Sequence, residues 1–266
     1  MRVVQLSDLH LCDGLLYSGI DPWRALALAL VRIDRLRPRA DVLLLSGDLA
    51  DDGNADTYRH LAELLARGSR IPALLPGNHD DRAALWAAFP NQAWRSEDFL
   101  CQRIDRGEVT LLLLDTLIPG REDGRFTAEH VAWLDAVCPH DRRVLLAMHH
   151  PPCAVGIAGM DFMGCTGAEL LAQWLSLQPQ VDVVEAVLCG HVHRHVTQIF
   201  AGHLTMTCPS TVHQIALQDG PLAWTPEAPG LLVHDLLPGQ ALRTHALPLA
   251  MAEVHGYDEA GDLAEY

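Results

Sequence analysis

The sequence predicts an α/β fold in which two packed sheets carry helices on their outer faces. Short apolar runs alternate with segments of helical spacing as far as Leu188, and the remainder is rich in strand-like runs. Several apolar runs are followed at once by polar side chains that can bind metals, as at strand ends. A chain of 266 residues with 49% hydrophobic content can bury one large core. We therefore expect one domain over residues 1–250 and an acidic tail over residues 251–266.

The first half of the chain predicts strands and helices in alternation. Val3–Leu6 is a short buried strand, and Trp23–Leu36 has apolar residues at helical spacing and is ended by Pro38. The elements expected next are the strand Val42–Leu45, the helix Thr57–Ala66, the strand Ile71–Leu75, a short helix from Arg82, the strand Thr110–Leu114, the helix Ala128–Val137 and the strand Val144–Ala147.

The second half changes from mixed structure to strands. Glu169–Leu175 has helical spacing, and Val183–Leu188 is a buried apolar run. The strands expected after these two elements are Val196–Phe200, His203–Met206, Leu231–Leu236 and Leu242–Leu247, with turns at Ala201-Gly202 and Pro238-Gly239.

Composition excludes several classes of protein. A formal charge of −15 argues against long nucleic acids, which require a basic face. No apolar run reaches the roughly 18 residues that span a bilayer, and no signal peptide is visible after Met1. Seven irregularly spaced cysteines argue against a disulfide framework, so we expect a cytoplasmic protein. The sequence contains no lysine, which excludes a Walker-type phosphate lysine.

Five short motifs offer metal ligands, each directly after an apolar run. They are Asp8-Leu-His10, Gly47-Asp48, Gly77-Asn78-His79-Asp80, His149-His150 and Gly190-His191-Val-His193. Alone, Asp-x-His is weak and Gly-Asp after a strand is usually a turn or a helix cap, whereas Gly-Asn-His-Asp is moderately specific and His-x-His can equally be a solvated strand face. The seven candidate ligands among them are two carboxylates, an amide and four imidazoles, which suffice for two divalent cations side by side.

Such a pair of cations suits the hydrolysis of phosphodiesters. Two ions about 3.5–4 Å apart can neutralise the phosphate and deprotonate a water that bridges them. Asp8 and His10 alternate along a segment expected to be extended, so a tight loop can turn both toward one ion. Asp48 is the natural shared carboxylate, and Asn78 offers a neutral oxygen. His149, His191 and His193 can fill the remaining positions. The expected chemistry is attack by a metal-bridging hydroxide.

Taken together, the motifs resemble those of the calcineurin-like metallophosphoesterase superfamily, D-x-H, G-D, G-N-H-D/E, H and G-H-x-H, over roughly residues 1–250. Further segments resemble the branch of class III cyclic nucleotide phosphodiesterases and bacterial glycerophosphodiesterases. These segments include Leu114-Asp-Thr116, Met148-His-His-Pro-Pro152 and Pro209-Ser-Thr-Val-His-Gln214. The resemblance implies a four-layer α/β/β/α sandwich of two mixed sheets flanked by helices.

The resemblance also implies roles for individual residues. His79 would stand beside the metals and protonate the leaving oxygen or contact the phosphate; the alternative is that it only orients Asn78. The metals would be Fe, Mn, Co or Zn, among which the ligand types do not choose. The implied ligands are Asp8, His10, Asp48 and His193 for the first metal, and Asp48, Asn78, His149 and His191 for the second.

Three further residues are candidates for contact with the substrate, namely Tyr17, Arg194 and His213. Arg194 follows the last motif and can equally face the solvent, and His213 rests on the resemblance alone. His150 is expected to be a structural neighbour of the site rather than a ligand. The loop Cys153–Thr166, rich in Gly and Met, is expected to cap the site.

The predicted function is therefore metal-dependent hydrolysis of a small phosphodiester, with 3′,5′-cyclic nucleotides such as cyclic AMP as the leading substrates. A glycerophosphodiester phosphodiesterase, or a promiscuous phosphomonoesterase and diesterase, is the alternative. A DNA nuclease would need a basic groove, and a metal-free scaffold would show substituted ligands, whereas all seven positions are intact. The Leu-rich C-terminal strands offer an edge for a homo-oligomer.

Overall fold

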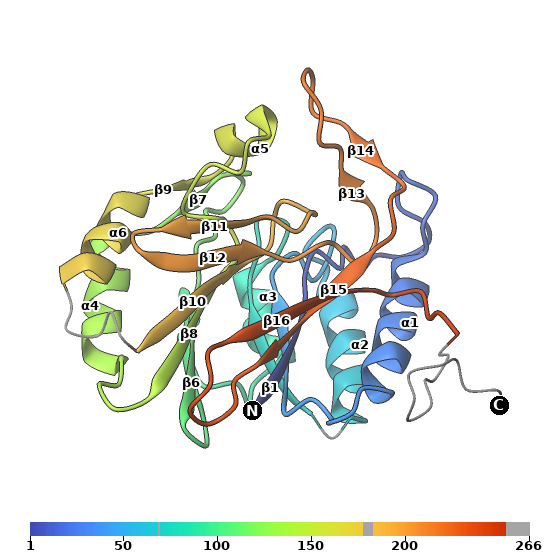
Figure 1. The fold of residues 1–266 in the computed structure, drawn as a ribbon. Coiled ribbons are helices and arrows are strands. Elements are labelled where there is room, and N and C mark those ends of the chain that lie inside the picture. The colour runs from blue at the N-terminus through green and yellow to red at the C-terminus, as the bar shows by residue number, and fades with distance from the viewer. Residues whose placement is uncertain (69, 178–182, 254–266) are drawn as a thin grey trace, which may run out of the picture.

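Two β-sheets form the centre of the computed structural model, which describes residues 1–68, 70–177 and 183–253 (Figure 1). The smaller sheet has the strand order β16-β15-β1-β2-β3. Its strands are β1 (Arg2–Leu6), β2 (Val42–Ser46), β3 (Ile71–Leu75), β15 (Gly230–Asp235) and β16 (Arg243–Pro248).

The larger sheet has seven strands in the order β11-β12-β10-β8-β6-β5-β4. They are β4 (Trp94–Ser96), β5 (Phe99–Arg106), β6 (Val109–Leu114), β8 (Arg143–Met148), β10 (Val184–Cys189), β11 (Thr197–Phe200) and β12 (His203–Thr207). Two short pairs stand apart from the sheets: β7 (Gly124–Arg125) with β9 (Cys165–Thr166), and β13 (Gln214–Ile215) with β14 (Trp224–Thr225).

Both sheets are mixed, with a parallel centre and antiparallel borders. Strands β1, β2 and β3 are parallel, and β15 and β16 run antiparallel to their neighbours. In the larger sheet β6, β8, β10 and β12 are parallel, β5 and β11 run antiparallel to them, and the border strand β4 pairs antiparallel with β5. The carboxyl ends of the parallel strands within each sheet therefore lie at one edge, where α/β proteins form their sites.

In the part of the chain that the structure describes, six helices cover the outer faces and the site edge. They are α1 (Pro22–Asp34), α2 (Ala55–Ala66), α3 (Arg82–Ala88), α4 (Ala128–Val137), α5 (Ala158–Phe162) and α6 (Ala168–Leu177). Figure 1 shows α1 and α2 on one side of the sheets and α4 and α6 on the other. Three apolar clusters join these layers, one between the sheets and one beneath each set of helices. The predicted four-layer α/β/β/α sandwich is confirmed.

The alternation of side chains along each strand explains this layering. In β1, Val3 faces the other sheet and belongs to the central cluster, whereas Val4 faces the helices. In β6, Leu111 belongs to the central cluster between the sheets, and Leu112 faces the helices. Because both faces of these strands are covered, the strands are apolar over most of their length, as parallel strands usually are.

Helices α1 and α2 begin where short polar side chains cap them. The Asp21 carboxylate accepts a hydrogen bond from Arg24 N, so α1 starts at Pro22, one residue before the predicted start. Asn54 caps α2 by accepting a hydrogen bond from Asp56 N, so α2 starts at Ala55, two residues before the predicted start. The helix Ala128–Val137 has the predicted bounds.

Several strands were not predicted. In β5, Gln102 and charged residues interrupt the apolar pattern, although Gln102 is buried and its Nε2 donates to Leu74 O at 2.6 Å. The two-residue strands β7, β9, β13 and β14 form only through pairing with distant segments, which local periodicity does not reveal.

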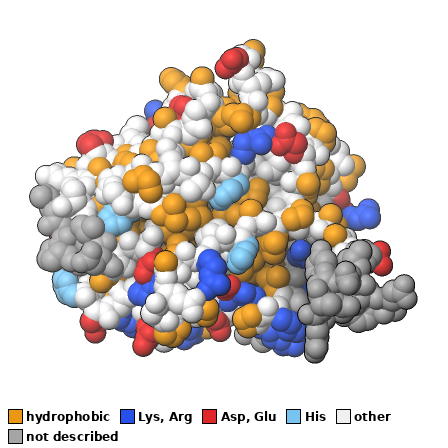
Figure 2. Space-filling view, viewed as in Figure 1, with side chains coloured by type: hydrophobic (Ala, Val, Ile, Leu, Met, Phe, Trp, Pro, Cys, Tyr) orange, Lys and Arg blue, Asp and Glu red, His pale blue; other side chains and the backbone are white. Residues whose placement is uncertain are grey.

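Among the helices of residues 1–68, 70–177 and 183–253, none has the length and apolar character that a membrane span needs. Basic and acidic side chains are interspersed over the described part of the face in Figure 2. The predicted boundary at residue 250 stays a prediction, and residues 254–266 of the expected tail lie outside the described residues.

Candidate metal centre

The seven predicted ligands come together at the carboxyl ends of five strands from the two sheets. Asp8 and His10 follow β1, Asp48 follows β2 and Asn78 follows β3 in the smaller sheet. The other three, which are His149, His191 and His193, follow β8 and β10 in the larger sheet. The site therefore joins the two sheets at one edge.

Unusual backbone conformations direct these side chains inward. Six non-glycine residues in the described part of the chain have a left-handed backbone, and five of them are predicted ligands. The φ angles are 53° at Asp8, 45° at His10, 50° at Asp48, 69° at His191 and 51° at His193. The prediction that Asp8 and His10 lie on an extended segment is therefore wrong. Both residues lie in tight turns, which point their side chains toward the cluster.

The side chains proposed for the first metal lie within a few ångströms of one another. His10 Nε2 is 3.0 Å from His193 Nε2 and 3.7 Å from Asp48 Oδ2. His193 Nε2 is 3.5 Å from Asp8 Oδ1. All four side chains are buried, and one ligand atom from each falls within 4.8 Å of the others. A single cation can contact all four.

The side chains proposed for the second metal adjoin the first group through Asp48. Asn78 Oδ1 is 3.2 Å from His149 Nε2 and 3.0 Å from His191 Nδ1. His149 Nε2 is also 3.4 Å from Asp48 Oδ2. His150 lies beside this group, but its Nδ1 pairs with Thr116 Oγ1 at 2.8 Å and its Nε2 with Glu122 O at 3.2 Å. We therefore keep His150 outside the ligand set.

Each of the four predicted ligand histidines has one ring nitrogen that faces away from the centre, and that nitrogen has a hydrogen-bond partner. The pairs are His10 Nδ1 with Asp51 Oδ1 at 2.9 Å, His149 Nδ1 with Ser46 O at 2.8 Å, His191 Nε2 with Met163 O at 3.0 Å and His193 Nδ1 with His213 O at 3.1 Å. Such outer partners set the ring orientation and select the nitrogen available to a metal. Met163 belongs to the loop expected to cap the site, so that loop contacts the candidate centre directly.

Burial and charge set the protonation of the cluster. Burial raises the pKa of the Asp8 carboxyl, and the charge of His149 offsets this in part. Burial also raises the pKa of Asp48, but the charge and hydrogen bond of His149 outweigh burial and hold the pKa of Asp48 well below its usual range. Burial lowers the pKa of His191 to about 3 and that of His193 well below its usual range. Both of these rings are therefore neutral, as metal ligands must be, whereas burial lowers the pKa of His149 but the charge of Asp48 outweighs burial and raises it to about 9, so this ring must lose a proton to bind a metal.

The donor set fits divalent cations. Asp8 Oδ2 is buried without a hydrogen-bond partner in the described structure. A buried carboxylate oxygen that lacks a partner is costly, and a metal ion would satisfy it. Mixed oxygen and imidazole ligands suit first-row transition metals and Zn²⁺. The cluster therefore fits the predicted dinuclear site, whereas the identity of the metal stays a prediction.

Two glycines allow the loops to approach so closely. A Cβ at Gly47 would lie 2.2 Å from His149 Nδ1, and Gly47 also has a φ of +93°. A Cβ at Gly77 would lie 2.1 Å from Asp48 Oδ1. Any side chain at either position would displace a predicted ligand, which explains the glycines that precede Asp48 and Asn78.

His79 stands at the rim of the cluster. Its backbone N donates to Asp48 Oδ1 at 2.9 Å, and its Nδ1 lies 2.8 Å from Asp51 O. The ring meets that of His10 edge to face, with centroids 4.8 Å apart, and the side chain is 35% exposed. Its Nε2 is therefore the ring nitrogen available to a molecule bound at this rim.

Buried Asp80 holds two ligand loops together. Its carboxylate accepts hydrogen bonds from the backbone N of Leu49, Ala50 and Gly77 and from the Tyr58 hydroxyl. Burial, with the nearby Asp48 charge, raises the pKa of Asp80 to about 6. This anchoring explains the acid that closes the Gly77–Asp80 motif.

The three residues predicted to contact substrate have different surroundings. Tyr17 Oη is 2.6 Å from His213 Nε2, and the His213 ring lies 4.9 Å from that of His193. The Arg194 guanidinium instead donates to Ile215 O at 2.9 Å and to Glu227 Oε2 at 2.6 Å. Tyr17 and His213 therefore border the cluster, whereas Arg194 pairs with other groups. Their roles toward substrate stay predictions.

Sequence reasoning missed several residues that lie near the ligands. Trp224, on β14, packs against Tyr17 and His213 with ring centroids 6.0 Å and 5.8 Å away. Asp51 pairs with His10, and Glu122 pairs with Asn78. Only Asp51 had a local signal, because it follows Asp48 within the same loop. Glu122 and Trp224 lie in segments that are far from the five motifs in the sequence.

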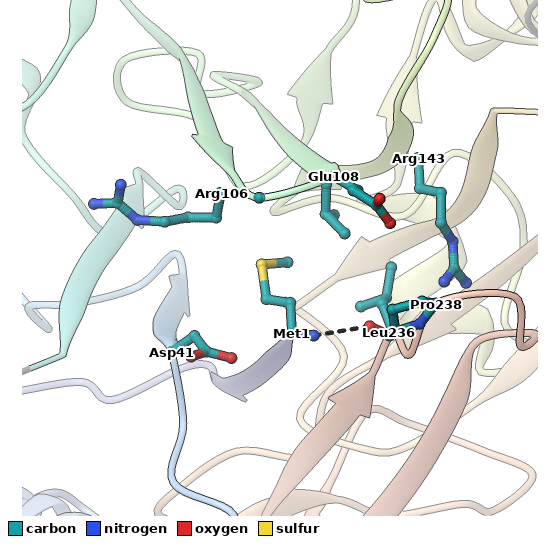
Figure 3. Close-up of a pocket in the computed structure, with 9 residues that line it drawn as sticks. Met1, Asp41, Arg106, Glu108, Arg143, Leu236 and Pro238 are labelled. Carbon is teal, nitrogen blue, oxygen red and sulfur yellow. Dashed lines mark hydrogen bonds between the residues drawn. The ribbon is translucent and has the colours of Figure 1, made fainter.

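A separate pocket lies at the opposite end of the strands (Figure 3). Its lining includes Met1, Asp41 and Arg143, which stand at or just before the start of β1, β2 and β8. The Met1 amino group donates to Leu236 O at 2.8 Å. Strands of five or six residues span about 17–20 Å, so this pocket is not part of the candidate centre.

Comparison with known proteins gives consistent matches. Residues 1–195 match the model of the calcineurin-like phosphoesterase family. The whole chain is 32% identical to a probable glycerophosphodiester phosphodiesterase, GpdQ of Arcobacter nitrofigilis, and covers 100% of it. It is 30% identical to the 3′,5′-cyclic adenosine monophosphate phosphodiesterase CpdA of Pseudomonas aeruginosa, over 88% of this chain and 85% of the relative.

A solved structure supports the fold. The purple acid phosphatase PPD1 from yellow lupin seeds superimposes with a TM-score of 0.60 at 12% identity. The match covers 93% of this chain but only 51% of the lupin enzyme. At this identity the likeness concerns the fold alone.

Proposed function

This chain belongs to the calcineurin-like phosphoesterase family and is a metal-dependent phosphodiesterase, and from this premise we propose that it hydrolyses small phosphodiesters, 3′,5′-cyclic nucleotides first among them. The observation that carries the proposal is the convergence of seven buried or partly buried ligand side chains at one edge of both sheets. Neither sheet alone could supply the complete set.

The proposed ligands divide into two groups that share one carboxylate. Two bound divalent ions would supply a nucleophilic water and neutralise the charge of the phosphate. Asp48 lies between the groups, with one oxygen near both His10 and His149, and is proposed as the shared ligand. The proposed assignment is Asp8, His10, Asp48 and His193 for one ion, and Asp48, Asn78, His149 and His191 for the other.

His79 is proposed to protonate the leaving oxygen. Its Nδ1 is held by Asp51 O, so the ring presents Nε2 toward the exposed side of the site. A protonated ring at this place can donate from Nε2 to the departing alkoxide, which needs a proton when its conjugate acid is weak. The hydrogen bond from His79 N to Asp48 Oδ1 fixes the distance between this group and the ligands.

Replacing His79 tests this role. His79→Ala is expected to retain two metals and to lose about 10²–10⁴-fold in kcat on esters with alkyl leaving groups. Esters of p-nitrophenol should be affected much less, because that leaving group needs no proton. Metal analysis and steady-state kinetics measure both effects. Wild-type turnover of the alkyl esters would leave His79 only an orienting role.

An aromatic wall beside the metals favours nucleotides. Tyr17 is 71% exposed and Trp224 41% exposed, and both border His213, which stands next to His193. Flat exposed rings provide stacking surfaces for a nucleobase, worth about 1–3 kcal/mol per base. A glycerol moiety offers no such face. This wall supports cyclic nucleotides as the leading substrates.

Glycerophosphodiesters are the second candidate. The 32% identity to the probable glycerophosphodiester phosphodiesterase extends over the full length of both chains, which favours this substrate class independently of the wall.

The deciding experiment measures kcat/KM for cyclic AMP and for glycerophosphoethanolamine on the same metal-loaded preparation. We expect cyclic AMP to be the better substrate. The reverse order would support the second candidate. Hydrolysis of neither compound by protein that holds two metals would contradict the proposed substrate class.

A further inference from the structure

Glu122 contacts one of the proposed ligands from outside the sequence motifs. It lies in the segment between β6 and β7, and its Oε2 accepts a hydrogen bond from Asn78 Nδ2 at 2.9 Å. The other end of the same amide, Asn78 Oδ1, faces His149 Nε2 and His191 Nδ1 at 3.2 Å and 3.0 Å. The Asn78 amide is thus held at both ends.

The two ends of an amide are not equivalent toward a metal. The oxygen can donate a lone pair to a cation, whereas the NH₂ group has only hydrogens to offer. A half-turn about the terminal bond would bring the NH₂ group to the histidine rings and the oxygen to the Glu122 carboxylate. Two oxygen acceptors would then oppose each other, so the hydrogen bond with Glu122 selects the orientation in which the oxygen is available.

The main chain around Glu122 is itself fixed. Its carbonyl oxygen pairs with His150 Nε2 at 3.2 Å. Gly124 packs so closely that a Cβ there would lie 2.4 Å from His150 Cγ. The Glu122 side chain is exposed, so solvent screens its charge and the directional hydrogen bond dominates its effect.

We propose that Glu122 is a positioning residue of the metal centre, which locks the Asn78 amide with its oxygen toward the second metal. This inference rests on the ligand assignment in the proposed function. Outer partners of this kind typically account for about 10–100-fold in metal affinity. The effect should be confined to the metal that Asn78 binds.

Titration of metal-free protein with Mn²⁺, followed by calorimetry, tests the inference without reference to catalysis. Glu122→Ala should weaken binding of one Mn²⁺ by about 10–100-fold and leave the other unchanged. Glu122→Gln should restore most of that affinity, because its side-chain oxygen can accept the same hydrogen bond. Asp123→Asn is the matched control, since Asp123 is the next residue and its carboxylate pairs with Arg121 rather than with Asn78.

Each outcome decides the matter. Wild-type affinity for both ions in Glu122→Ala would overturn the inference. Glu122→Gln as weak as Glu122→Ala would show that the charge, and not the orientation of Asn78, matters. Wild-type protein that binds a single Mn²⁺ would overturn the inference together with the ligand assignment. Two bound ions without phosphodiester hydrolysis would contradict the proposed function alone and leave the role of Glu122 intact.

Discussion

At the residue scale, the candidate centre depends on groups that are costly to maintain. Left-handed backbone at a non-glycine residue costs of order 1–3 kcal/mol, and five proposed ligands adopt it. Asp8 and Asp48 also bury carboxylates side by side. The surrounding hydrogen bonds hold these arrangements in place, such as those from His191 N to Asp8 Oδ1 and from Ser210 Oγ to Asp8 O.

Asp48 is the residue whose loss should be most damaging. Asp48→Ala removes the carboxylate that lies near both groups of ligands, so protein purified with excess metal should bind fewer than two ions. We expect activity to fall by more than the roughly 100-fold that follows when a residue that only hydrogen-bonds to a metal ligand is replaced. Metal analysis and phosphodiesterase assays measure the two effects. Asp52→Asn, an exposed neighbour, should behave as wild type. Two metals and full activity in Asp48→Ala would contradict the assignment.

At the scale of elements, the parallel strands bring the ligands to one edge and the irregular segments complete the rim. The hairpin β13–β14 extends beyond the sheets, with α5 near it (Figure 1). A Cβ at Gly159 in α5 would lie 3.0 Å from Leu222 Cβ, which shows how closely the hairpin loop approaches this helix. The hairpin also carries Trp224, so the wall beside the metals depends on its position.

Removal of the hairpin tryptophan should change substrate preference. Trp224→Ala should raise the KM for cyclic AMP by about 10-fold, because a stacking surface for the base is lost. The KM for glycerophosphoethanolamine should change little. Trp86→Ala is the control, since Trp86 is similarly exposed, at 37%, but lies on α3 against Trp94. Equal changes for both substrates would show that Trp224 supports the site only structurally.

Strand β15 contains a buried histidine that makes stability depend on pH. His234 pairs with Thr244 Oγ1 and Gln5 Oε1, and burial lowers its pKa to about 3. The unfolded chain, with an ordinary pKa near 6.5, therefore binds more protons between these two values. Its contribution to stability is intact above about pH 6.5 and declines as the pH falls, by up to about 1.4 kcal/mol per pH unit.

His234→Gln should remove this dependence while keeping a donor toward Gln5. Urea unfolding at pH 7.5 and pH 5.0, in the same metal-containing buffer, should show a smaller loss of stability for the variant than for wild type. Contributions from the other histidines are common to both proteins and cancel in the difference. Parallel losses in the two proteins would mean that His234 does not titrate in this range.

At the scale of the whole molecule, the candidate centre links the two sheets. The cluster between them is apolar, whereas at the carboxyl edge His149 from the larger sheet meets Asp48 from the smaller one. Bound metals would therefore stabilise the arrangement of the sheets as well as the site.

Metal removal should lower the thermal stability. A ligand present at 100 times its Kd stabilises the folded state by about 2.7 kcal/mol, which for a domain of this size shifts the Tm by roughly 5–10 °C. Calorimetry of EDTA-treated and Mn²⁺-reloaded protein measures the shift. Asp48→Ala should respond less to EDTA. An unchanged Tm on complete metal removal would contradict the proposed link between the sheets.

The sequence by itself determined the layers and the ligand types. Continuous apolar runs such as Val42–Leu45 specify buried strands, and Gly47-Asp48 and Gly77-Asn78 place polar groups at their ends. Both signals are local, because periodicity and turn residues act over a few positions. The tertiary structure decided the left-handed turns at Asp8 and His10, the contact of Glu122 with Asn78, and the place of Trp224 beside His213. These depend on packing between segments far apart in the chain, and no local pattern encodes such contacts.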